Sequence, residues 1–348
     1  MAAITATLTF LINAGDNIIA SYSKYGDVYL RKLNIDKDMS SKIVTLTLSP
    51  TIDKSSSVEK LIAEQKLKCA VPKIEPGGGG INVSRGLKRL GKDSLAIFPC
   101  GGYDGELFKE LLTKENIVHQ SIETKSTTRE NFIVVDKSTN SQYRFGMPTE
   151  EIFPDEEEQI LKALESLLPI PEYIIASGSM PPGIGLDFFA RVAQFSKKAG
   201  LRFIVDTSGE ALEQAINEGV FLLKPNLNEL SQLVGAKSLD TKEIVNAARK
   251  LISDGKCEIV VVSMGAEGAY LVTKELSDHV KAPHVKKLST VGAGDSMVAG
   301  MVFALSNGKS LPEVVRMGVA CGSAATMNPG TELFKKVDAE ELFRKLNL

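Results

Sequence analysis

The sequence predicts an α/β fold: a mostly parallel central sheet with helices on both faces, and a small β lid attached to it. From Lys42 onward, short continuous apolar runs alternate with longer amphipathic stretches. Continuous apolar strands between helices are typical of a parallel sheet that helices cover on both sides. Two further segments alternate apolar and polar residues without an intervening helix, which indicates a separate small β layer.

The strands of the main sheet are expected at apolar runs bounded by Gly, Ser, Pro or Asp. One helix is expected to begin near Ile81 and another to span about Asp104 to Lys114. Ligands of such sheets bind at the carboxyl ends of the strands, so the polar residues after each run mark the expected site. The predicted strands are Ile43–Leu48, Leu95–Phe98, Tyr173–Ala176, Phe203–Val205, Phe221–Leu223 and Ile259–Val262.

The lid is expected at about residues 53–76 and 126–148. Ser55–Ala70 shows β-like alternation, and Asn131–Asp136 and Gln142–Phe145 are joined by only Lys-Ser-Thr-Asn, which predicts a hairpin. A lid of this kind excludes water from an active site and so prevents hydrolysis of the reacting group.

Two domains are expected. Residues 41–348 form the α/β domain with its lid. Residues 1–40 precede the first strand of the sheet and repeat nothing downstream, so we interpret them as an amino-terminal extension of unknown role.

Composition excludes several classes of protein. The net charge is −2 and no Lys/Arg block is long, which argues against a nucleic-acid partner. No apolar run approaches the roughly 20 residues that span a membrane. The four cysteines are scattered without a CxxC pair, which favours reduced thiols and a cytoplasmic location. The three histidines show no metal-ligand spacing, so acid–base chemistry is expected from a carboxylate.

The run from Thr290 to Asp295, Thr-Val-Gly-Ala-Gly-Asp, is the strongest candidate for catalysis. It precedes the apolar stretch Met297–Leu305, which predicts a buried helix. A helix amino terminus binds anions through its unpaired N–H groups and could stabilise a phosphoryl group during its transfer. Asp295, in the first turn, could then act as general base. Taken alone, the motif fits a simple capped turn better.

Two other motifs add weight to this interpretation. Gly77–Gly80 leads into a helix and lets the main chain approach a ligand closely, while Asn82 could bind hydroxyl groups. Asn226 and Glu229, just after a strand, could share a hydrated Mg²⁺ that bridges ATP phosphates. Alone, an NxxE pattern fits a solvated helix start better.

These motifs, in this order, resemble the ribokinase-like (PfkB) family of carbohydrate kinases. The resemblance covers essentially Lys42–Leu348 and includes Leu48-Ser-Pro-Thr-Ile-Asp53. Neither a Walker A motif nor the HRD and DFG motifs of protein kinases occur. The resemblance implies an ATP-dependent kinase that uses Mg²⁺ and a monovalent cation, usually K⁺.

The resemblance also implies roles for individual residues, carried over position by position. Asp295 matches the catalytic base, and Glu332 departs from the basic residue of close relatives beside the cation loop. The remaining matches are the anion hole at Gly292, Ala293 and Gly294; the sugar pocket at Asp53, Gly78, Gly79 and Asn82; the nucleotide and Mg²⁺ region at Lys224, Asn226, Glu229, Ser263 and Gly265; and the monovalent-cation site at Ser289, Val291, Asn328 and Gly330.

The acceptor implied by the resemblance is fructose 6-phosphate, phosphorylated at the 1-hydroxyl. Fructose 1-phosphate and tagatose 6-phosphate kinases typically carry a lysine at the position of Gly79. A substrate phosphate needs fixed positive charge, for which Arg129 is suited, with Arg144 and Ser179 as further candidates. Lys66 is a candidate for binding the nucleotide. For Arg144 and Lys66, an exposed sheet-edge charge fits equally well.

The alternatives that stay open are tagatose-6-phosphate kinase, 1-phosphofructokinase and, from another class, a non-catalytic sugar-phosphate-binding protein. The last would be expected to lack the base or the glycine run. A homodimer built on the lids is also implied, burying apolar lid residues such as Phe132, Val134 and Phe145.

Overall fold

The computed structural model describes residues 18–22, 28–32 and 42–347. The chain divides into two compact units, Met1–Ser41 and Lys42–Leu348. In the first unit, β1 (Ile18–Tyr22) and β2 (Val28–Lys32) pair antiparallel. The rest of the expected amino-terminal extension lies outside the described residues.

The second unit is built on a nine-stranded sheet. Its strand order is β15-β14-β13-β12-β11-β10-β3-β6-β7, and every pair from β13 to β7 is parallel. The predicted mostly parallel sheet is confirmed. The bounds are β3 Ile43–Leu46, β6 Leu95–Cys100, β7 Val118–Glu123, β10 Tyr173–Ser177, β11 Arg202–Asp206, β12 Val220–Leu223, β13 Cys257–Ser263, β14 Ala269–Val272 and β15 Ser277–Val280.

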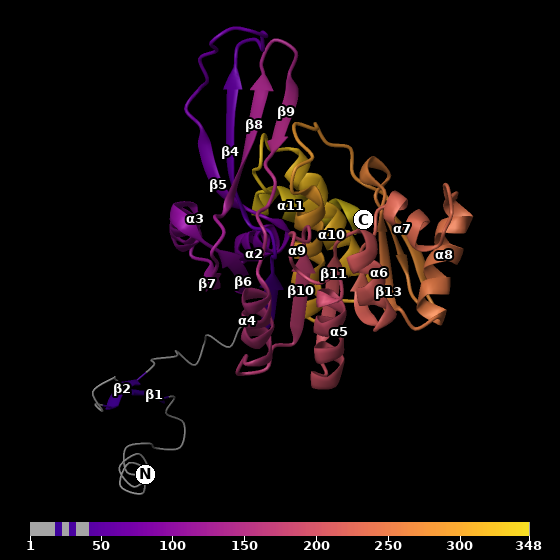
Figure 1. The fold of residues 1–348 in the computed structure, drawn as a ribbon. Helices are drawn as coiled ribbons and strands as arrows, with labels where there is room; N and C mark the ends of the chain where they lie inside the picture. The colour runs from indigo at the N-terminus through magenta and orange to yellow at the C-terminus, as the bar shows by residue number, and fades with distance from the viewer. Residues whose placement is uncertain (1–17, 23–27, 33–41, 348) are drawn as a thin grey trace, which may run out of the picture. The chain divides into compact units, whose positions relative to one another are not determined.

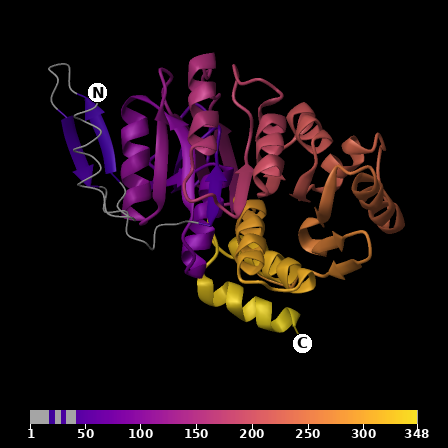
Figure 2. The same cartoon turned by 90° about the horizontal axis from the view of Figure 1, so that it is seen from below.

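Helices cover both faces of this sheet, with a separate apolar core under each layer. Residues alternate along a strand between the cores: Val260 faces one and Val261 the other. Figure 2 shows the yellow carboxyl-terminal helices on one side of the sheet. That layer holds α2 Gly79–Leu90, α3 Gly102–Lys114, α9 Ala293–Ser306, α10 Leu311–Thr326 and α11 Lys336–Leu346; the other holds α4 Pro154–Glu165, α5 Phe188–Ala199, α6 Gly209–Asn217, α7 Leu227–Leu233 and α8 Thr241–Ser253.

A four-stranded sheet forms the lid and projects from one end of the body (Figure 1). Its order is β5 (Lys73–Gly77), β4 (Thr51–Val58), β8 (Arg129–Asp136) and β9 (Ser141–Gly146). The predicted hairpin is confirmed, because β8 and β9 pair antiparallel with Phe132 opposite Phe145. The prediction for Ser55–Ala70 was wrong in part: β4 ends at Val58, and residues 59–72 contain no strand.

The sequence pattern missed the antiparallel edge of the main sheet. Strands β14 and β15 pair antiparallel beyond β13. The last strand reads Ser-Asp-His-Val, which has little apolar character to reveal it. Within the described ranges, no helix is long and apolar enough to cross a membrane.

Candidate active site

Asp295 lies at the carboxyl edge of the main sheet, where three elements meet. Gly292 has a φ of 69° and turns the chain into α9, so that Asp295 falls in the first helical turn. Its Oδ2 accepts a hydrogen bond from Asn82 Nδ2 on α2 at 2.9 Å. Its Oδ1 accepts one from Ser177 Oγ, at the end of β10, at 3.4 Å. The structure therefore brings the predicted base and the predicted sugar ligand Asn82 together.

Burial raises the pKa of the Asp295 carboxyl to about 6. The Asn82 hydrogen bond lowers this pKa, Asp206 raises it, and Lys224 and Ser177 lower it. A carboxylate with a pKa near neutrality is a better proton acceptor than an ordinary aspartate. A shift of this kind is typical of catalytic acids and bases.

The run Gly77–Gly80 packs so closely against its neighbours that side chains at these positions would clash. Gly78 has a φ of 110°, a conformation that other residues rarely adopt. A Cβ on Gly79 would come within 2.6 Å of the Gly178 backbone nitrogen and 2.5 Å of the Ser177 carbonyl carbon. A Cβ on Gly77 would come within 2.9 Å of Asp53 Cγ. The run therefore packs directly against the end of β10 and against β4.

One face of the lid carries polar groups beside the glycine run. Asp53 is buried, and its Oδ1 accepts a hydrogen bond from Asn131 Nδ2 at 3.1 Å. Burial raises the pKa of Asp53, although Asn131, Arg85 and Arg129 oppose the shift. Arg129 donates from Nη1 to the Met147 carbonyl at 3.1 Å, while its buried Nε has no hydrogen-bond partner.

Arg144 links the lid to the helix start. Its Nη2 donates to Thr290 Oγ1 at 3.3 Å, across the gap between β9 and the loop before α9. The same guanidinium also contacts Gln142 on its own strand at 3.1 Å. Arg144 is exposed, yet it faces the site and is not a purely solvated edge charge.

A cavity of about 480 Å³ lies on the other side of the α9 start. Lys224 is buried beside it and forms an ion pair with Asp206 at 3.1 Å. Burial would lower the pKa of Lys224, but Asp206 outweighs this and holds it above its ordinary value, so the ammonium stays charged. The lining includes Ser263, Gly265, Ala266, Pro283, His284, Thr290, Ala293, Gly294 and Ser323.

Asn226 and Glu229 cap helix α7. Asn226 Oδ1 accepts from the Glu229 backbone N–H at 3.0 Å, and Glu229 Oε2 accepts from the Asn226 backbone N–H at 2.8 Å. The two residues therefore have a local structural role, and shared binding of Mg²⁺ stays a prediction. In the part of the chain that the structure describes, no group of three or more His, Cys, Asp or Glu could hold a metal.

The residues predicted to bind a monovalent cation lie on two joined loops. Ser289 Oγ donates to the Gly330 carbonyl at 2.8 Å and accepts from the Val291 backbone N–H at 3.2 Å. Asn328 Nδ2 donates to the Ala324 carbonyl at 3.1 Å. Glu332 forms an ion pair with Lys73 at 2.8 Å, which accounts for an acidic residue here.

Two predicted residues do not join this assembly. Ser179 is exposed in the loop after β10, and Lys66 is exposed in the connection between β4 and β5.

Sequence reasoning also missed Ser177 and Asp206, the last residues of two strands. Their signal was available, because both stand at carboxyl ends of strands next to predicted site residues.

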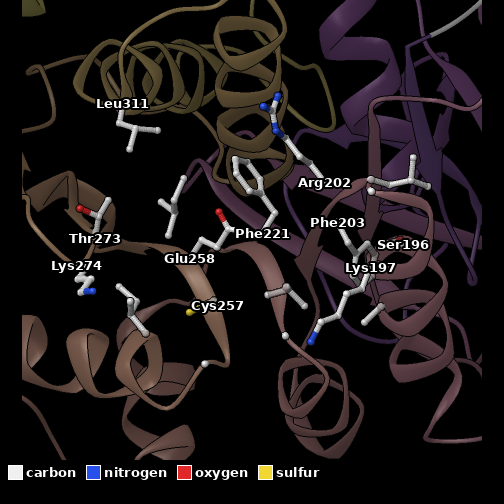
Figure 3. Close-up of a pocket in the computed structure, with 18 of the residues that line it drawn as sticks. Ser196, Lys197, Arg202, Phe203, Phe221, Cys257, Glu258, Thr273, Lys274 and Leu311 are labelled. Carbon is white, nitrogen blue, oxygen red and sulfur yellow. The ribbon is translucent and has the colours of Figure 1, made fainter.

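A larger, more open cavity of about 950 Å³ lies at the opposite edge of the sheet, at the amino ends of β11, β12 and β13. Figure 3 shows its side chains, in which the cations of Lys197, Arg202 and Lys274 are interspersed with acidic Glu258. None of the predicted site residues lines it. Size therefore does not identify the active site in this fold, whereas the position at the carboxyl ends of the strands does.

Comparison with known proteins agrees with this geometry. Residues 42–336 match the pfkB family carbohydrate kinases. The ATP-dependent 6-phosphofructokinase isozyme 2 of Escherichia coli K12 is 42% identical, over 88% of this chain and 99% of that protein. A 1-phosphofructokinase of Borreliella burgdorferi is 33% identical, over 82% of this chain and 92% of that protein.

Two solved structures are similar throughout the second unit. One is phosphofructokinase-2 from Escherichia coli in complex with potassium, with a TM-score of 0.84 and 42% identity. The other is the same enzyme in complex with fructose-6-phosphate, with a TM-score of 0.83 and 40% identity. Each covers 88% of this chain and 99% of the solved chain. The chain belongs to the pfkB family of carbohydrate kinases.

Proposed function

We propose that this protein transfers the γ-phosphoryl group of ATP to the 1-hydroxyl of fructose 6-phosphate, giving fructose 1,6-bisphosphate and ADP. The observation that carries the proposal is the position of Asp295. Its carboxylate is held by Asn82 and Ser177 on the sugar side, and it begins the helix that borders the 480 Å³ cavity on the other. A base at the junction of two pockets suits transfer between two substrates.

In the proposed reaction, the oxygen of the sugar 1-hydroxyl attacks the γ-phosphorus, and Asp295 accepts the proton of that hydroxyl. The bond from phosphorus to the β–γ bridging oxygen breaks, and ADP leaves with that oxygen. The backbone N–H groups at the α9 start, from Gly292 to Asp295, stabilise the charge that develops on the transferred group. Lys224, kept cationic by Asp206, adds positive charge beside the same helix start.

The residues present also suit the two expected cations. Glu229 offers a carboxylate, and Mg²⁺ binds carboxylate oxygens and substrate phosphates. The Ser289 and Gly330 loops are tied together and offer hydroxyl and carbonyl oxygens, which are the ligands that replace water around K⁺. When bound, Mg²⁺ and K⁺ supply positive charge that offsets the phosphates.

One observation favours a phosphorylated sugar as the acceptor, and a second favours fructose 6-phosphate among the phospho-sugars. The unpartnered, buried Nε of Arg129 is ready to donate to a substrate phosphate. The wall at Gly79 is closed to any side chain by Ser177 and Gly178. A lysine at this position, as in the fructose 1-phosphate and tagatose 6-phosphate branches, would require the end of β10 to move.

The test is a coupled assay of ADP release with ATP and, in turn, fructose 6-phosphate, fructose 1-phosphate and tagatose 6-phosphate. We expect the highest kcat/KM with fructose 6-phosphate. A preference for either of the others would contradict the substrate assignment. A sugar-phosphate-binding protein without catalysis would release no ADP above the rate without sugar.

We further propose a homodimer through the lid. The lid face that turns away from the site carries the rings of Phe132, Phe145 and Tyr143, each about 40–47% exposed, with the Lys54 ammonium 5.8 Å from the Phe132 ring centroid. Phe132 lies directly opposite Phe145, and Val134 opposite Tyr143, so that they form one patch. A second copy of the same face would remove these rings from water.

A further inference from the structure

The buried Arg85 side chain lies directly behind Asn82 and the start of the glycine run. It lies on α2, is only 1% exposed, and sits one helical turn after Asn82. Its five N–H donors meet acceptors on every side. Nε and Nη2 donate to Glu115 at 2.8 and 2.7 Å, Nη2 also donates to Glu75 at 2.9 Å, and Nη1 donates to the Pro76 carbonyl at 2.9 Å and faces Asn82 Oδ1 at 3.5 Å.

This arrangement determines which way the Asn82 amide points. A guanidinium carries only donors, so the side of Asn82 that faces Arg85 must be its oxygen. The amide nitrogen then points the other way and donates to Asp295 Oδ2 at 2.9 Å. A flipped amide would place its NH₂ group against the cation and its oxygen against the Asp295 carboxylate, and both contacts would be unfavourable.

Arg85 with its partners Glu75 and Glu115, called the Arg85 clamp below, is held in place by further contacts. Glu75 is buried, and its second oxygen accepts a hydrogen bond from Thr331 Oγ1 at 2.8 Å. Burial would raise the pKa of Glu75, but Arg85 and Lys73 outweigh this and hold it below its ordinary value. Glu75 therefore stays charged, and its ion pair with Arg85, together with the two hydrogen bonds from Arg85 to Glu115, holds the guanidinium against Asn82.

We propose that Arg85 is a positioning residue for catalysis: it fixes the Asn82 amide so that Asn82 donates to, and keeps ionised, the carboxylate of Asp295. This inference rests on the proposed role of Asp295 as base. Arg85 touches neither substrate in this scheme and acts on Asp295 through Asn82, while its charge also lowers the pKa of Asp53. The other charged groups that act on Asp295 are Asp206 and Lys224, which form an ion pair with each other.

The test is a double-mutant cycle read on the acid side of the pH dependence of kcat/KM with fructose 6-phosphate. Asn82→Ala removes the donor to Asp295 and should move the acid-side midpoint to higher pH by about one unit. Arg85→Lys keeps the positive charge but loses the planar set of guanidinium N–H donors that holds Asn82. It should move the midpoint in the same direction by about half a unit. The double variant should match Asn82→Ala alone.

Arg89→Lys is the matched control. It is the same substitution one turn further along α2, where Arg89 Nη1 donates to the Phe334 carbonyl at 2.8 Å, away from Asn82. We expect its midpoint to equal that of the wild type. Titration of the substrates is common to all variants, so differences in midpoint report the enzyme.

Two results would overturn the proposal: an unshifted midpoint in Arg85→Lys with reduced kcat, or shifts that add fully in the double variant. Should Arg85→Lys fail to fold, Glu115→Ala releases one side of the guanidinium while leaving Arg85 in place. It should give a smaller shift in the same direction, and no shift would count against the clamp. A wild-type profile with no acid-side decline would instead contradict the role of Asp295, so the two failures are distinguishable.

Discussion

At the residue scale, the buried carboxylate of Asp295 is suited to act as a base, but it lowers the free energy of unfolding. Its carboxyl is partly enclosed at the α9 start, and burial raises its pKa to about 6. Between the ordinary value of 3.8 and about 6, the folded protein binds a proton that the unfolded chain releases. Stability therefore falls as pH rises through this interval, and the charged base is destabilising at neutral pH.

Replacing Asp295 with Asn should accordingly stabilise the fold. We expect a gain of about 3 kcal/mol in the free energy of unfolding at pH 8 and about half of that at pH 5. Urea unfolding at both pH values measures it. Asp93→Asn, at an exposed aspartate paired with Lys88, is the control and should change stability by less than about 0.5 kcal/mol. An equal or lower stability of Asp295→Asn at pH 8 would contradict the burial of the charge.

Sequence alone could locate the residues that belong to motifs but not those that act through them. Asp295 and Asn82 stand in recognisable runs, and the structure joins them directly. Ser177 could have been singled out from its place at the end of a strand. Arg85 could not, because its importance depends on which side chains lie opposite it after folding. The NxxE pair shows the reverse case, since Asn226 and Glu229 first of all cap a helix.

At the scale of elements, the lid has two chemically different faces. Successive residues of a strand point to opposite sides, so Asn131 turns toward Asp53 and the pocket while Phe132 turns outward. Arg144 and Phe145 on β9 follow the same rule. Under the proposed function, one face of this small sheet covers the sugar and the other forms the dimer interface.

Phe132→Asp should weaken the proposed dimer, because it places a charge in the centre of the apolar patch. We expect the molar mass from light scattering to shift from dimer toward monomer. Thr139→Asp, in the exposed turn between β8 and β9, adds the same charge at the tip of the lid and should leave the mass unchanged. A monomeric wild type, or a Phe132→Asp variant of unchanged mass, would contradict the lid interface.

The sequence pattern predicted elements best where they are long or buried on both faces. The central strands and the helix after Gly292 appear within a few residues of their expected positions. The lid connection at residues 59–72 did not follow its alternating pattern, because an exposed segment has no core to enforce that pattern. The polar edge strand β15 was missed for the related reason that edge pairing needs few apolar residues.

At the scale of the whole molecule, the described site lies within the second unit. Lys42–Leu348 contains every residue of the candidate site, and the family match begins at residue 42. The backbone carbonyl of Lys42 also accepts hydrogen bonds from the N–H groups of Glu172 and Tyr173, so Lys42 is part of the sheet. We therefore propose that residues 1–41 are not needed for catalysis.

A chain that begins with Met followed directly by Lys42 should keep the kcat and KM of the full chain within about twofold. A second truncation that also removes Lys42 and Ile43 is the control, and it should lose thermal stability because β3 is then shortened. Steady-state kinetics and thermal unfolding measure both. A large loss of activity in the first truncation, with its stability intact, would assign the extension a role in the reaction.

The central claim is that Asp295 is the base of a phosphoryl transfer to fructose 6-phosphate. The most direct measurement is ADP release with saturating ATP and fructose 6-phosphate by the wild type and by Asp295→Asn, with folding of the variant verified by its unfolding curve. The account predicts that kcat of the variant falls by at least about 100-fold while the protein stays folded. Comparable turnover by the two proteins would contradict it.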